Sequence, residues 1–184
     1  MRPTTEQPTG TALDTLLQDQ VLAGDWVLDR DTSSITLKNK SMWGLVPVRG
    51  QFRELTGHGV VSPEGETSGT ITVASASIDT GNTRRDTHLR SADFFDSVSN
   101  PDIIFHATGI RPSSQGVTVT GMLTVRDRTR PLTFEAAATV QGNGDVCLDA
   151  EVHVNQVEFG LTWNLLGTVS KDNTLTIHAV FARR

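Results

Sequence analysis

The sequence predicts an all-β protein: one closed antiparallel barrel of about eight strands, with a short amphipathic helix near the N-terminus. Apolar and polar residues alternate with a period of two after Asp25, as in strands with one face in water. Thr and Val, which favour strands, are abundant in these runs. Turn sequences rich in Gly, Asn, Asp and Pro separate them. Since an open sheet of this size would expose its edges, we expect it to close into a barrel.

The segment before the strands predicts the helix. Thr11–Asp14 has the form of a capping box, and Gly24 is an expected helix stop. We therefore divide the chain into a mobile tail with a helix (1–24) and a barrel domain (25–184). The helix either covers one barrel end as structure or closes over a bound ligand as a lid. Its apolar stripe, and so the face of the lid, consists of Leu13, Leu16, Leu17 and Val21.

The strands themselves are read from the alternation, and the turns from the residues between the runs. Eight strands leave an interior that is either filled by side chains or wide enough for one small ligand. Turns are expected at 63–66, 142–145 and 171–173. The clearest alternating runs are 34–38, 70–73, 103–108, 117–125, 132–140, 146–154 and 175–181.

Composition excludes several classes of function. The 184 residues suit one domain, and the net charge of −5 offers no basic surface for nucleic acid or an anionic membrane. The single cysteine, Cys147, excludes an intrachain disulfide and a thiolate metal cage. The histidines lack the spacing of a metal site, and no nucleotide-binding motif appears, so we expect no metal and no cofactor. The polar start and the lack of a membrane-spanning run predict a cytoplasmic protein without an integral membrane segment.

The stretch 77–105 is rich in charge and carries a Phe-Phe pair. Arg85, Asp86 and His88 are residue types that bind polar head groups or act as acids and bases. They are equally suited to clamp a long connection onto the barrel through hydrogen bonds and ion pairs. Phe94 and Phe95 are expected to anchor the same connection in the apolar interior.

This stretch also carries a family resemblance. IDTGNTRRDTHLRSADFFD (78–96), followed by NPDIIFHATGI (100–110), resembles the YceI family of polyisoprenoid-binding, lipocalin-like proteins. The resemblance implies a lipocalin-like barrel whose apolar lumen holds a long isoprenoid or amphipathic chain. Because the charged motif belongs to a family that binds ligands, the resemblance favours the clamp for Arg85, Asp86 and His88. Further matches extend it from Trp26 to the C-terminus: 26–29, 50–52, 55–57, 121–125 and 131–134.

The expected ligand site combines this resemblance with bulky apolar residues near bends in the chain. Such residues serve either as core or as a wide apolar mouth. Gln156 stands where family members commonly carry Arg, which changes the polar lining at that end of the barrel. The polar lining candidates are Asn39, Gln51, Gln156 and Asn164. The expected ligand-binding residues are Trp43, Leu45, Val48, Phe52, Phe95, Phe105, Met122, Phe134, Phe159, Trp163 and Leu165.

Two functions are compatible with these residues. The first is a binding protein for a long polyisoprenoid-, quinone- or acyl-like molecule. The alternative is a cofactor-independent cyclase of a polyketide or polyene pathway, catalysing a [4+2] ring closure by ordering its substrate in the apolar barrel. No catalytic residue is assigned. The expected partner is a hydrophobic small molecule, without nucleic acid, and the sequence leaves a homodimer open.

Overall fold

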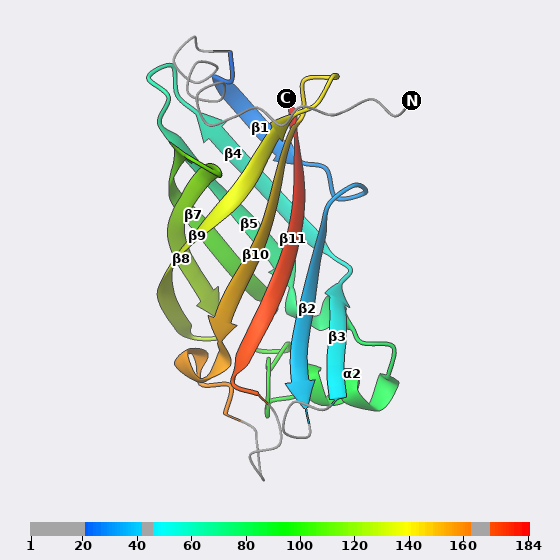
Figure 1. Ribbon diagram of the computed structural model, residues 1–184. Helices are drawn as coiled ribbons and strands as arrows, with labels where there is room; N and C mark the ends of the chain where they lie inside the picture. The colour runs from blue at the N-terminus through cyan, green and yellow to red at the C-terminus, as the bar shows by residue number, and fades with distance from the viewer. Residues whose placement is uncertain (1–20, 42–45, 163–169) are drawn as a thin grey trace.

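The computed structural model describes residues 21–41, 46–162 and 170–184, and its strands form one antiparallel sheet that closes on itself. The first strand of the ring pairs with the second strand along one edge and with the last strand along its other edge, and this closes the ring. This confirms the predicted barrel of eight strands (Figure 1). The ring order is β1 (Gly24–Leu28), β4 (Leu55–Val61), β5 (Thr67–Ala74), β7 (Asp102–Ser113), β8 (Gly116–Val125), β9 (Arg128–Val140), β10 (Val146–Asn155) and β11 (Asp172–Arg183).

The last strand, β11, is long enough to pair with two strands along one edge. Its C-terminal part pairs with β1, in the register Trp26↔Arg183, and its N-terminal part pairs with a second strand, in the register Lys38↔Thr174. The lower half of the wall in Figure 1 therefore continues beyond the eight-strand ring. The strands that continue it are β2 (Ser34–Ser41), β3 (Val46–Phe52) and β6 (Ile78–Asp79).

Three short helices accompany the strands in the described part of the chain. The α-helix follows β6 and lies at the lower end of the barrel in Figure 1. None of the described helices has the length and apolarity needed to cross a membrane. The helices are η1 (Ser75–Ser77), α2 (Thr83–Arg90) and η2 (Gln156–Phe159).

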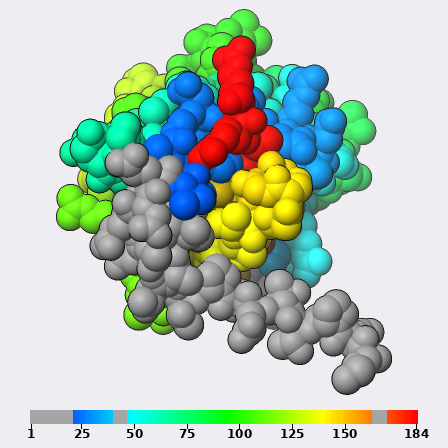
Figure 2. Space-filling model, turned by 90° about the horizontal axis from the view of Figure 1, so that it is seen from above, coloured from blue at the N-terminus to red at the C-terminus, as the bar shows by residue number. Residues whose placement is uncertain are grey.

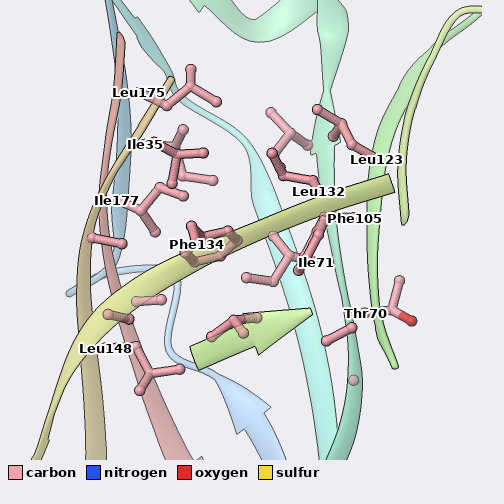
Figure 3. Close-up of a pocket in the computed structure, with 18 of the residues that line it drawn as sticks. Ile35, Thr70, Ile71, Phe105, Leu123, Leu132, Phe134, Leu148, Leu175 and Ile177 are labelled. Atoms are coloured by element: carbon pink, nitrogen blue, oxygen red, sulfur yellow. The ribbon is translucent and has the colours of Figure 1, made fainter. Parts of the chain in front are cut away.

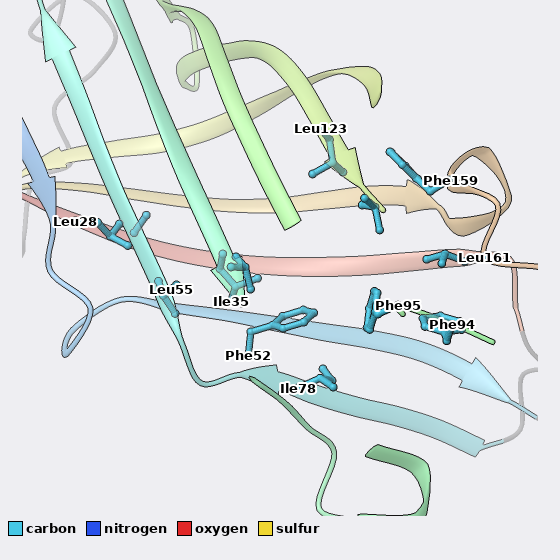
Figure 4. Close-up of a cluster of buried hydrophobic side chains, with 13 residues drawn as sticks. Leu28, Ile35, Phe52, Leu55, Ile78, Phe94, Phe95, Leu123, Phe159 and Leu161 are labelled. Atoms are coloured by element: carbon cyan, nitrogen blue, oxygen red, sulfur yellow. The ribbon is translucent and has the colours of Figure 1, made fainter. Parts of the chain in front are cut away.

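The core follows from the period-two alternation, which turns every second side chain inward. In β8, Val117, Val119, Leu123 and Val125 are buried. Inward side chains form two clusters, one near the chain termini and one near α2 and η2. Figure 4 shows the second cluster, where side chains of several strands meet Phe94 and Phe95. Residues that pack against both clusters are Phe105, Leu148 and Phe181.

The N-terminal boundary differs in part from the prediction. The stripe residues Leu13, Leu16 and Leu17 lie outside the described residues. Val21 and Leu22 form a turn before β1. Gly24 is the first residue of β1 and has a φ of 140°, a conformation that other residues rarely adopt.

Candidate functional site

A cavity of about 260 Å³ lies inside the barrel, between and within the two clusters. In Figure 3, side chains from strands on opposite sides of the ring point into a common space. Almost all of them are aliphatic or aromatic, so the wall offers dispersion and hydrophobic contact rather than charge. The labelled apolar lining residues are Ile35, Ile71, Phe105, Leu123, Leu132, Phe134, Leu148, Leu175 and Ile177.

Two aromatic rings lie at the middle of the wall. The centroids of Phe105 and Phe134 are 5.6 Å apart, with the ring planes inclined by 49°. The Phe105 ring covers Gly121, where a Cβ atom would come within 2.6 Å of its Cζ. The absence of a side chain at Gly121 therefore lets the Phe105 ring lie against the wall of the cavity.

The Phe-Phe pair of the charged stretch lines the cavity at the end near α2 and η2. Phe94 and Phe95 meet edge to face, with centroids 4.8 Å apart, and Phe95 lies 6.0 Å from the Phe52 ring. The Phe95 amide donates to the Leu89 carbonyl over 2.9 Å. Arg126 Nη1 donates to the Phe94 carbonyl over 3.2 Å. The chain after α2 is thus held so that both rings line the cavity.

The charged residues of the stretch contact the protein itself. The buried Asp86 Oδ1 accepts hydrogen bonds from Thr80 N (3.0 Å) and Thr80 Oγ1 (2.6 Å). Arg85 Nε donates to Thr80 Oγ1 over 2.8 Å, and its Nη2 donates to the Thr80 carbonyl over 3.1 Å. The His88 carbonyl accepts from Ser91 Oγ over 2.7 Å at the end of α2. These bonds fasten α2 to the chain after β6, and none of the three predicted clamp residues lines the cavity.

One end of the cavity is polar. Gln156 and Asn173 are the only buried polar side chains among the described lining residues. Asn173 Nδ2 donates to Gln156 Oε1 over 3.2 Å, and Asn39 Nδ2 donates to Asn173 Oδ1 over 2.5 Å. Asn39 Nδ2 also donates to the Ser170 carbonyl over 3.2 Å. A short chain of neutral amides therefore borders an otherwise apolar space.

At the end near the chain termini, Leu22, which precedes β1, lines the cavity. Trp26 Nε1 donates to the Leu22 carbonyl over 3.0 Å, and the Arg183 guanidinium lies 5.2 Å from the Trp26 ring centroid. Arg183 Nη2 also donates to the carbonyls of Val21 and Ala23. In Figure 2, which looks down on this end, the end of β11 (red), the start of β1 (blue) and the β9–β10 connection (yellow) adjoin. Leu22 is buried and lines the cavity, whereas the predicted lid residue Val21 is 51% exposed and does not.

The other predicted site residues fall into three groups. Trp43, Leu45, Trp163, Asn164 and Leu165 lie outside the described residues. Val48, Asn39 and Gln51 are described but are not among the lining residues. Those that the structure brings together around the cavity are Phe52, Phe95, Phe105, Phe134, Gln156 and Phe159.

The prediction of Met122 as a lumen residue was wrong. Its side chain is 38% exposed and is not among those lining the cavity. The reason is the strand period: Gly121 and Leu123 are the inward positions, so the residue between them faces outward. The sequence interpretation also missed Trp26, Ile71 and Asn173 as lining residues. The alternation of apolar and polar residues along β5 could have identified Ile71 as an inward residue. Nothing in the sequence around Asn173 indicates that its side chain lines the cavity.

The carboxyl groups with shifted pKa values lie outside the cavity. The Gly81 amide and the Arg53 guanidinium hold the pKa of Asp79 below its ordinary value. The hydroxyls of Ser113 and Thr118 lower the pKa of Glu135. Among the described lining residues, the only titratable side chain is the exposed His58. The described wall is thus suited to holding an apolar molecule.

Comparison with known proteins supports this assignment of the fold. The family model of the YceI-like domain matches residues 26–181 of this chain. A UPF0312 protein of Serratia proteamaculans (strain 568) is 34% identical over 112 residues, covering 58% of this chain and 58% of that protein. Protein YceI of Escherichia coli O6:H1 is 38% identical over 73 residues, covering 40% of this chain and 38% of the relative. This chain therefore spans less than two thirds of the length of either relative.

Solved structures share the barrel. Burkholderia cenocepacia BcnA has a TM-score of 0.76 at 22% identity, over 83% of this chain and 98% of that chain. A polyisoprenoid binding domain from Saccharophagus degradans, implicated in plant cell wall breakdown, has a TM-score of 0.70 at 12% identity, over 86% of this chain and 98% of that chain. At these identities the likeness concerns the fold. Because the YceI-like family model matches residues 26–181, which is most of the chain, this chain belongs to the YceI-like family.

Proposed function

We propose that this protein binds one long hydrophobic or amphipathic molecule inside the barrel. The observation that carries the proposal is the cavity of about 260 Å³, with its apolar wall and two buried amides at one end. Removing apolar ligand surface from water stabilises the complex by about 25 cal/mol per Å², before the costs of binding. An apolar site with a few placed polar groups is the usual form of a small-molecule pocket.

The chemistry of the wall supports a polyisoprenoid-, quinone- or acyl-like ligand. Branched aliphatic and aromatic side chains make up most of the lining, and they pack well against a methyl-branched chain. The amides of Gln156 and Asn173 are neutral, so they suit a hydroxyl or carbonyl end rather than an anionic head group. The polyisoprenoid binding domain of Saccharophagus degradans, which shares the fold, supports the same ligand class.

The cyclase alternative is not carried forward. No observation on the described residues favours ring closure over simple binding, and the family comparisons favour binding. A cytoplasmic location and a homodimer stay predictions from the sequence. Cell fractionation and light scattering of the purified chain test them.

The proposal is tested by filling the cavity. Ala138 is buried and lines it, whereas its neighbour Ala137 lies on the other face of β9. We expect Ala138→Phe to weaken binding of geranylgeraniol by tenfold or more, about 1.4 kcal/mol. Ala137→Phe is the matched control and should bind like the original chain. Binding is measured by co-elution of the labelled alcohol with delipidated protein. Failure of the unmodified chain to bind, or equal binding by both variants, contradicts the proposal.

A further inference from the structure

Three different donor side chains meet on the outer face of β10 and β11. Asp149 and His178 are directly opposite each other in the register of the two strands. Cys147 precedes Asp149 by two residues and so shares its face of the sheet. Leu148, between them, points into the cavity instead. This group is thus separated from the ligand cavity by the barrel wall.

The distances within the group are short. Cys147 Sγ lies 3.4 Å from Asp149 Oδ2 and 3.6 Å from His178 Nδ1. His178 Nδ1 lies 2.6 Å from Asp149 Oδ1. All three ligand atoms lie within 4.8 Å of one another. One position on the solvent side of the three atoms is therefore within reach of a sulfur, a nitrogen and an oxygen.

The two distances from Cys147 Sγ can be compared with the ligand spacing of a tetrahedral zinc site. With ordinary Zn–S and Zn–N lengths, tetrahedral ligands are about 3.6 Å apart for sulfur and nitrogen or oxygen. The two distances from Cys147 Sγ agree with this spacing. His178 Nδ1 lies 2.6 Å from the other carboxylate oxygen, Asp149 Oδ1, so this hydrogen bond has to break before Nδ1 and Oδ2 can bind one ion. Both side chains are about half exposed, which leaves them room to turn.

We propose that Cys147, Asp149 and His178 form a binding site for Zn²⁺, with water as the fourth ligand. The mixed sulfur, nitrogen and oxygen donors suit this borderline-soft ion better than Mg²⁺ or Ca²⁺, which take oxygen ligands. The side chains of His178 and Asp149 are 43% and 54% exposed, which leaves an approach for the ion. Cys147 is only 5% exposed, so the protein shields the thiolate that results.

Binding requires the thiol to lose its proton to solvent as the Zn–S bond forms. Burial raises the pKa of the Cys147 thiol to about 11, and the Asp149 carboxylate contributes to this as the second cause. Without a cation, the thiol therefore keeps its proton at neutral pH. A divalent ion beside the sulfur reverses this preference. The site departs from the expectation of no metal. Sequence spacing could not show it, because strand pairing brings His178 to Cys147 and Asp149.

The test uses the metal alone on the full chain. We expect one Co²⁺ per chain to bind, to give a thiolate-to-cobalt charge-transfer band in the near ultraviolet, and to be displaced by Zn²⁺. Cys147→Ser should remove the band, and His178→Gln should weaken binding by tenfold or more. His153→Ala is the matched control, because His153 lies on the same strand pair beside Glu151 and Thr174 but without a cysteine. It should leave binding unchanged.

Several results would overturn the site. These are no charge-transfer band in the unmodified chain, cobalt binding that survives Cys147→Ser and His178→Gln, and loss of binding in His153→Ala alone. Circular dichroism of each variant verifies its fold. His178 is partly exposed, so His178→Gln keeps the test valid if the buried Cys147→Ser variant fails to fold. The cobalt measurement involves no ligand in the barrel, so a negative result does not bear on the proposed ligand binding.

Discussion

The side-chain amide of Asn173 donates a 3.2 Å hydrogen bond to Gln156 Oε1, and both side chains are buried where they border the cavity. The two residues come from β11 and from η2, so this contact joins the last strand to the turn after β10. Under the proposed function, these two buried amides meet the polar end of the ligand.

Gln156→Leu should reduce the preference for a ligand with a polar end. The change keeps a similar volume but removes the amide that bonds Asn173. Under the proposed function, the same amide meets the ligand hydroxyl. We expect the affinity for geranylgeraniol, relative to the matching hydrocarbon, to fall by about tenfold, since one unsatisfied buried group costs about 1–3 kcal/mol. Competition binding measures this ratio. Gln51→Leu, on β3 and away from the cavity, is the control, and an unchanged ratio in Gln156→Leu would rule out the assigned role.

Phe95→Ala should destabilise the barrel strongly. The ring contacts Phe52 and Phe94 and lines the cavity. Truncating a buried phenylalanine lowers the free energy of unfolding by about 3–5 kcal/mol. Val98→Ala, in the same connection but 96% exposed, should change it by less than about 0.5 kcal/mol. Urea denaturation of both variants gives the comparison, and equal effects would mean that the ring does not anchor this segment.

Leu22→Ala should loosen the end of the barrel near the chain termini. The Leu22 side chain is buried against the cavity, and its carbonyl accepts from Trp26 Nε1. We expect about 2 kcal/mol of lost stability and faster release of bound ligand. Val21→Ala, at the exposed neighbour, should alter neither quantity. Thermal denaturation and ligand exchange rates measure the two effects. Ligand release that speeds up equally in both variants would refute this role of Leu22.

Cys147 should react slowly with alkylating agents in metal-free folded protein. Its thiol pKa is raised to about 11 from an ordinary value of 9.0, by burial first and by Asp149 next. The reaction rate should therefore reach half its maximum near pH 11 when folded and near pH 9 in urea. Since the folded pKa is the higher one, the stabilising contribution of this thiol is present below pH 9 and is lost as the pH rises toward 11. A folded-state midpoint at or below pH 9 would contradict this.

The alternation of apolar and polar residues was sufficient to predict the barrel, because a strand period of two survives in long runs such as β8 and β10. It was weaker for β4, where Gly57 and Gly59 occupy two of seven positions and interrupt the apolar pattern. The helix α2 was missed because its sequence, TRRDTHLR, has no apolar stripe. Its local signal is the Asn82 cap, whose side chain accepts from the Arg85 amide.

The site was predicted only in part, for a related reason. The phenylalanines were found because bulky apolar residues in a barrel face inward, and Gln156 because it departs from the family pattern. Asn173 and the Cys147–Asp149–His178 group depend on which strands pair and in which register. A single sequence does not reveal the register between distant strands, and a shift of one residue reverses every face.

Native mass spectrometry of the freshly purified full chain, followed by extraction and identification of the bound molecule, tests ligand binding without assuming the ligand. We predict a non-covalent complex with one hydrophobic molecule that ends in a hydroxyl or carbonyl group, present in Ala137→Phe and lost in Ala138→Phe. An unmodified chain that is empty on isolation and takes up neither geranylgeraniol nor its hydrocarbon would contradict a role in binding such molecules.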